Sequence, residues 1–98
     1  MGIEALDITF RLEKAFGIRI PAGYLYWSAE QRLLKPLPRS TATVGEVHQR
    51  ICELLVGMKP PVPDDSWELV TKCIGGALSI PPNGICAEDR LIEDLGVS

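Results

Sequence analysis

The chain has 98 residues, of which 46% are hydrophobic and 23% charged, and its formal net charge is −3. This composition is typical of one globular domain, and the negative charge argues against a nucleic-acid partner. No apolar run is long enough to cross a membrane, and the N-terminus lacks the pattern of a signal peptide. We therefore expect a cytoplasmic protein with no membrane partner.

The first predicted element is a helix over residues 3–16, which Gly17 ends and Pro21 keeps from resuming. Its charged side chains fall on one narrow stripe, and most of the remaining circumference is apolar. The stripe consists of Glu4, Asp7, Arg11 and Lys14. A helix of this kind is expected to be packed on several sides, with Phe10 buried and the charged stripe facing solvent.

An aromatic loop at residues 24–27 follows, and together with two later leucines it is interpreted as a hydrophobic flap over the core. The flap consists of Tyr24, Leu25, Tyr26, Trp27, Leu33 and Leu34. Ser28 and Gln31 have the spacing of a capping box, in which each side chain binds a backbone N–H of the other residue. A short helix is therefore expected from Ser28 to about Lys35, before two prolines that end it.

Thr43 and Glu46 form a second predicted capping box, at the start of a helix over residues 44–57. The apolar residues of that helix lie on one side only, which indicates one buried face. Residues 58–65 contain three prolines and are predicted to be a stiff, extended linker.

A third possible capping box, Asp65 to Glu68, precedes a helix over residues 66–78. Gly75 and Gly76 cost this helix roughly 1 kcal/mol each in propensity, so we expect another backbone to approach closely there, or a frayed end. After a loop at 79–87, residues 88–95 are predicted to form a short helical turn. The predicted class is all-α.

Catalytic and metal-binding patterns are weak. His48 and Cys52 lie four residues apart on one helix, but two ligands do not make a zinc site, and packing at the edge of the core is the favoured interpretation. The three cysteines have no C-x-x-C spacing and are expected to be reduced thiols. No nucleophile-elbow or phosphate-loop motif is present, so no enzymatic activity is predicted.

Two separated regions carry a resemblance to a known family. Residues 12–21 read L-E-K-A-F-G-I-R-I-P and residues 43–47 read T-V-G-E-V; both resemble an acyl carrier protein from its second helix onward. Residues 69–78 and the segment R-L-I-E-D-L-G at 90–96 resemble that family's first helix and the approach to its modification motif. The order is rotated, so the chain resembles a circularly permuted acyl carrier protein over most of its length.

This resemblance implies a small four-helix bundle with permuted connectivity, in one domain of residues 1–98. Residues 1–57 would correspond to the family's second to fourth helices, and residues 66–98 to its first helix and D-L-G turn, joined by the linker at 58–65. In the family the second helix is buried, so the helix at 66–78 is expected to return and pack on the helix at 3–16.

The family's modified serine has no clear equivalent here. That serine follows D-L-G-x-D and carries 4′-phosphopantetheine, whose thiol holds the acyl chain. Alignment backward from Phe16 places Gly2 at the serine position, and alignment forward from Asp94 places Ser98 at the preceding aspartate. Arg11 and Lys14 also interrupt the acidic helix with which the family docks on partner enzymes.

The sequence therefore predicts a non-enzymatic, acyl-carrier-protein-like interaction or accessory module without a cofactor, whose protein partners would be acyl-chain or polyketide biosynthetic enzymes. The expected docking residues are Glu4, Asp7, Arg11, Lys14, Tyr24 and Trp27. One alternative is a working acyl carrier with phosphopantetheine on Ser98. Another is a domain-swapped or homodimeric structural protein, in which the C-terminal block covers the first helix of a neighbouring chain.

Overall fold

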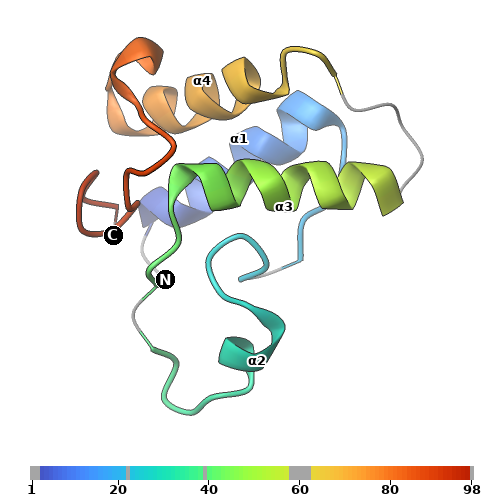
Figure 1. Cartoon of the computed structure of the whole chain (residues 1–98), viewed down its shortest axis with the longest axis vertical. Coiled ribbons are helices and arrows are strands. Elements are labelled where there is room, and N and C mark those ends of the chain that lie inside the picture. The colour runs from blue at the N-terminus through green and yellow to red at the C-terminus, as the bar shows by residue number, and fades with distance from the viewer. Residues whose placement is uncertain (1–2, 22, 39, 58–62, 98) are drawn as a thin grey trace.

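The structure is a computed structural model that describes residues 3–21, 23–38, 40–57 and 63–97. It contains four α-helices and one short 3-10 helix within these ranges (Figure 1). They are α1 (Ile3–Phe16), α2 (Ala29–Arg32), α3 (Val44–Gly57), α4 (Ser66–Leu78) and η1 (Pro82–Gly84). The described residues hold no β-strand beyond an isolated bridge between Thr43 and Arg90, so the all-α class is confirmed.

The helix α1 ends at the predicted place. Gly17 adopts a positive φ of 65°, which a residue with a side chain reaches only with strain. The Glu13 carboxylate then accepts a hydrogen bond from the backbone N–H of Ile20 at 2.8 Å. This bond fixes the direction in which the chain leaves the helix, so that Ile18 and Ile20 point into the core.

The short helix α2 begins with the predicted capping box. Ser28 Oγ accepts a hydrogen bond from the Gln31 N–H at 3.2 Å, and Gln31 Oε1 accepts one from the Ser28 N–H at 2.9 Å. The helix ends at Arg32 rather than near Lys35, because no residue of α2 is buried and nothing prolongs it beyond one turn.

The N-terminus of α3 is capped partly by a distant segment. Thr43 Oγ1 accepts a hydrogen bond from the Glu46 N–H at 3.2 Å, which is one half of the predicted capping box, whereas the Glu46 carboxylate lies 3.6 Å from Arg50 Nη2. The N–H groups of the first two helical residues donate instead to carbonyls of the C-terminal segment, Val44 to Asp89 and Gly45 to Ala87, each at 2.9 Å. The C-terminal segment thus holds the start of α3 in place.

Helix α4 spans the predicted residues without the predicted cap. Asp65 occupies the N-cap position but its side chain makes no capping hydrogen bond. The close approach expected at the two glycines is present, because a Cβ added to Gly75 would collide with the carbonyl oxygen of Ile80. Ser79 ends the helix in the left-handed conformation, at φ 60°.

The core lies where α4 meets α1 and α3 (Figure 1). The prediction that the helix at 66–78 returns to cover the first helix is confirmed, and it does so within one chain. Fully buried side chains come from all three helices and include Ile8, Leu12, Val44, Val47, Ile51, Leu55, Val70 and Ile74.

The short helical turn predicted at 88–95 is present over residues 91–95 only, where the N–H groups of Asp94 and Leu95 both donate to Arg90 O, at 2.9 and 3.1 Å. Other backbone groups of the C-terminal segment bond to distant residues: besides the bonds from α3, Leu91 donates its N–H to Ala42 O at 3.1 Å. Leu91 and Val97 are buried and therefore attach this segment to the core. Of the predicted linker at 58–65, residues 58–62 lie outside the described residues.

Candidate functional site

The outer face of α1 is apolar and uncovered. Ile3, Leu6 and Phe10 are 83%, 57% and 55% exposed. Their spacing of three and four residues places them on one side of the helix. The prediction that α1 is packed on several sides, with Phe10 buried, is therefore wrong. The inner side, with Ala5, Ile8 and Leu12, is the buried one.

The predicted charged stripe borders this face. Asp7 and Arg11 form the expected ion pair across one helical turn, with 3.2 Å between Arg11 Nε and Asp7 Oδ1. The Lys14 ammonium lies 4.7 Å from the centre of the Phe10 ring, close enough for a cation–π contact. Glu4 is half-buried. The outer face of α1 thus combines an apolar centre with charged groups at its edge.

The aromatic loop is part of the core and offers little docking surface. Leu25, Tyr26 and Trp27 are buried, and the Trp27 indole N–H donates to Pro38 O at 2.7 Å. The Tyr26 hydroxyl donates to Ala5 O at 2.9 Å. Burial raises the pKa of Tyr26, so the phenol stays neutral. The flap interpretation is confirmed for Leu25, Tyr26 and Trp27, but it is wrong for Leu33 and Leu34, which are 82% and 54% exposed. Trp27, being 9% exposed, is placed poorly for the predicted docking role.

Tyr24 differs from its neighbours because it is only partly buried. It borders an open groove of about 220 Å³. The groove is lined by Tyr24, Trp27, Ser28, Ala29, Arg32, Arg50 and Glu53. The Arg32 guanidinium lies 5.7 Å from the centre of the Tyr24 ring, and Arg50 donates to Leu25 O at 2.7 Å. Of the two predicted aromatic docking residues, Tyr24 is the accessible one.

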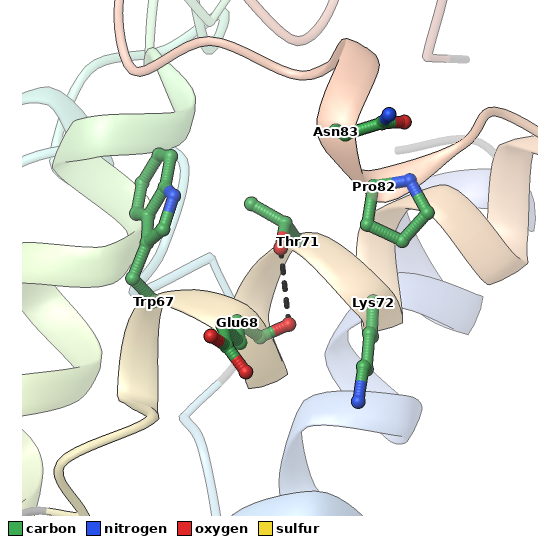
Figure 2. Close-up of a pocket in the computed structure, with 6 residues that line it drawn as sticks. All are labelled: Trp67, Glu68, Thr71, Lys72, Pro82 and Asn83. Carbon is green, nitrogen blue, oxygen red and sulfur yellow. Dashed lines mark hydrogen bonds between the residues drawn. The ribbon is translucent and has the colours of Figure 1, made fainter.

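A second open groove, of about 290 Å³, runs across α4 and η1 (Figure 2). Trp67 and Pro82 stand on opposite sides of Thr71 in this view. The Thr71 hydroxyl is engaged with its own helix, since it donates to Glu68 O at 3.0 Å. The lining residues Trp67, Glu68, Thr71, Lys72, Pro82 and Asn83 include no histidine or cysteine.

A cluster of polar and titratable side chains at the edge of the core surrounds His48. Its Nε2 lies 2.8 Å from Ser66 Oγ and 3.6 Å from Cys52 Sγ, and its ring meets the Trp67 ring edge-on at 5.4 Å. Burial lowers the pKa of His48, so the neutral imidazole is favoured. This arrangement agrees with the predicted packing role; its link to Ser66 joins α3 to α4, a contact that the sequence did not indicate.

Metal ligands do not gather within the described residues, where no three histidine, cysteine or acidic side chains could share an ion. Cys52, Cys73 and Cys86 are free thiols, as expected. Burial raises the pKa of Cys73, which opposes its conversion to a reactive thiolate. Gly2 and Ser98, the two positions considered for phosphopantetheine, lie outside the described residues.

The D-L-G turn is ordered by local charges. The backbone N–H of Arg90 donates to Asp94 Oδ2 at 2.8 Å, and the guanidinium lies within ion-pair distance of Asp94 and Glu93. These contacts with Arg90 hold the pKa of Asp94 below its usual value. Gly96 then adopts φ 73°, which ends the turn before Val97 enters the core.

Comparisons with protein-family models, with curated proteins and with solved structures find no match. The resemblance to acyl carrier proteins therefore stays a prediction. Among the helices that the structure describes, none has both the length and the apolarity to cross a membrane.

Proposed function

We propose that this chain is a non-enzymatic interaction module, similar to an acyl carrier protein, that docks on a protein partner through the outer face of α1. The observation that carries the proposal is the apolar row of Ile3, Leu6 and Phe10, each more than half exposed. Three large apolar residues lie on this outer face, although α1 already buries its opposite side in the core. Exposed apolar groups that adjoin one another commonly mark interaction surfaces.

The border of this face supports docking on a protein. Protein–protein interfaces typically have an apolar centre with aromatic anchors and a polar rim. Phe10 supplies the aromatic group, and Asp7, Arg11 and Lys14 supply the rim. Because the rim contains both signs of charge, the partner surface is expected to be mixed in charge rather than strongly basic.

The internal packing supports the carrier-like part of the proposal. The rotated order of motifs implies that the helix at 66–78 is the neighbour of the first helix, and α4 does pack on α1. The partner class that follows from the resemblance is an enzyme of acyl-chain or polyketide biosynthesis.

The direct test is a calorimetric titration of the purified chain against a ketosynthase and an acyltransferase of such a system. We expect saturable binding to one of them, and a loss of at least about tenfold in affinity for Leu6→Ser and Phe10→Ser, since each removes part of the apolar centre. Val56→Ser is the matched control, because Val56 is 71% exposed on α3 and lies outside this face. Absence of binding to both enzymes, or equal binding by all variants, contradicts the proposal.

The rival assignment, an acyl carrier modified on Ser98, has its own test. The full chain is incubated with coenzyme A and a phosphopantetheinyl transferase, and its intact mass is measured. The proposal expects an unchanged mass. A gain of one phosphopantetheine group, located on Ser98 by peptide mass spectrometry, would contradict the proposed accessory role and indicate an acyl carrier.

A further inference from the structure

A second exposed apolar surface lies far from the outer face of α1 in sequence. It belongs to residues 28–38, which comprise the Ser28 cap, α2 and the turn that follows, and which we name the α2 lobe. Leu33, Leu34 and Leu37 of this lobe are 82%, 54% and 51% exposed. None of these three leucines belongs to the core cluster or packs against it, so core packing does not account for them.

The lobe is held at one end of the molecule. Figure 1 shows α2 and the turn after it at the lower end of the long axis, beyond the three longer helices. Hydrogen bonds fix its base: the Trp27 indole donates to Pro38 O at 2.7 Å, and the Ser28–Gln31 capping box closes its first turn. The leucines therefore sit on a projecting tip that can touch a flat surface before the rest of the molecule does.

Charge sets the lobe apart from the remainder of the chain. Arg32 and Lys35 flank the leucines and are exposed, and Glu30 is the one acid between residues 28 and 38. Two cations and one acid give the lobe a net charge of +1, so the remainder of the chain carries −4. Near an anionic surface the lobe is attracted while the remainder is repelled, which favours an approach with the tip first.

We propose that the α2 lobe docks on the surface of an anionic phospholipid bilayer, with its leucines at the boundary of the acyl chains and Arg32 and Lys35 among the headgroups. Such surface binding combines buried apolar area with attraction of basic residues to anionic lipid. It requires no spanning helix, but it departs from the sequence-based expectation that the chain has no membrane partner. It is independent of the docking face on α1.

The composition of the lobe favours lipid over a protein partner. Energetically dominant residues of protein interfaces are enriched in Trp, Tyr and Arg, whereas Leu is under-represented among them. Residues 28–38 contain no aromatic residue, and their apolar groups are leucines with an alanine and two prolines. The leucines also follow an irregular turn, so they do not form the regular row with which a helix fits a protein groove.

The test is co-sedimentation of the full chain with vesicles of phosphatidylcholine alone and of phosphatidylcholine mixed with phosphatidylglycerol. We expect binding to the mixed vesicles that weakens as salt rises, and much weaker binding to phosphatidylcholine alone. Lys35→Gln is expected to weaken binding about fivefold, the effect of one basic residue at an anionic surface. The double variant Leu33→Ser/Leu34→Ser is expected to weaken it about tenfold or more.

A matched control variant distinguishes binding through the α2 lobe from nonspecific adsorption of the chain to vesicles. Val56→Ser removes a side chain that is 71% exposed on α3, and it is expected to bind mixed vesicles like the unchanged chain. Far-ultraviolet circular dichroism checks that all variants are folded, as the exposure of the altered side chains predicts. The proposal is overturned if the unchanged chain does not bind mixed vesicles, if it binds both kinds equally, or if the leucine variant binds as well as Val56→Ser.

Discussion

Gly75 and Gly76 are neighbours in α4 with different surroundings, and this difference yields a sharp prediction about packing. Gly75 is buried, and a Cβ added there would meet the backbone carbonyl of Ile80 and lie 3.6 Å from Ile85 Cδ1. Gly76 is exposed, and a Cβ added there would lie 2.9 Å from Arg11 Nη1, the end of a flexible side chain. Only the first contact involves backbone, which cannot move without its neighbours.

The expected free energies follow from these contacts. Replacing either glycine by alanine gains about 1 kcal/mol of helix propensity. At Gly75 the clash costs about 1–3 kcal/mol and strains the hydrogen bond from Ile80 N to Gly75 O, so we expect a net destabilisation of about 1–2 kcal/mol. At Gly76 the guanidinium of Arg11 moves aside and weakens an exposed ion pair worth roughly 0.5 kcal/mol, which leaves a net gain of about 0.5 kcal/mol.

Urea unfolding followed by circular dichroism measures both variants. Gly75→Ala should unfold at a lower urea concentration than the unchanged chain, and Gly76→Ala at an equal or higher one. The slope of the free energy of unfolding against urea concentration should be the same in all three chains. Equal stability of the two variants would refute the close approach of Ile80 to α4. A stabilised Gly75→Ala would refute it more strongly.

Three further predictions concern the core and its titration. Phe10→Ala should change the free energy of unfolding by less than about 1 kcal/mol, because Phe10 is 55% exposed. Leu12→Ala should cost about 2–5 kcal/mol, because Leu12 is fully buried. Equal costs of the two variants in urea unfolding would contradict the exposed outer face of α1. Tyr26→Phe removes the donor to Ala5 O and should cost about 1–3 kcal/mol in the same assay, and a neutral result would contradict that buried hydrogen bond. Burial lowers the pKa of His48 in the folded chain, so the unfolded chain binds this proton more readily; stability should be complete above the ordinary pKa of 6.5 and decline as the pH falls below it. Below pH 6.5, the thermal unfolding temperature should fall less with pH in His48→Gln than in the unchanged chain. An equal fall in both would contradict the lowered pKa of His48.

The helices themselves were predictable because their signals are local. The apolar spacing of residues 44–57 and the cap at Thr43 give the bounds of α3, and Gly17 gives the end of α1. The Ser28 capping box likewise needs only the four residues that form it. The predicted helical turn at 88–95 is present only over residues 91–95, because the Asp89 carbonyl bonds to α3 and the Leu91 N–H bonds to Ala42. Such distant pairing leaves no local pattern in the sequence.

The candidate surfaces were harder to predict. Apolar residues around most of α1 indicated burial on several sides, but a chain of this size has too few other elements to cover them all, so Phe10 remains at the surface. At Trp27 the error has the opposite sign. Its position in a loop suggested that a partner could reach it, whereas its indole ring is buried against the core. Leu33 and Leu34 were likewise predicted to lie in the flap over the core, but they are exposed because α2 ends after one turn and has no buried residue.

We propose the outer face of α1 as the docking surface for a protein partner. Its most direct test is an NMR titration of the labelled chain with the enzyme found to bind it. The account predicts that the amide signals that shift belong to residues along α1, centred on Leu6 and Phe10, while those around Val56 on α3 stay in place. Shifts centred on α3, or on the groove between Trp67 and Pro82, would contradict it.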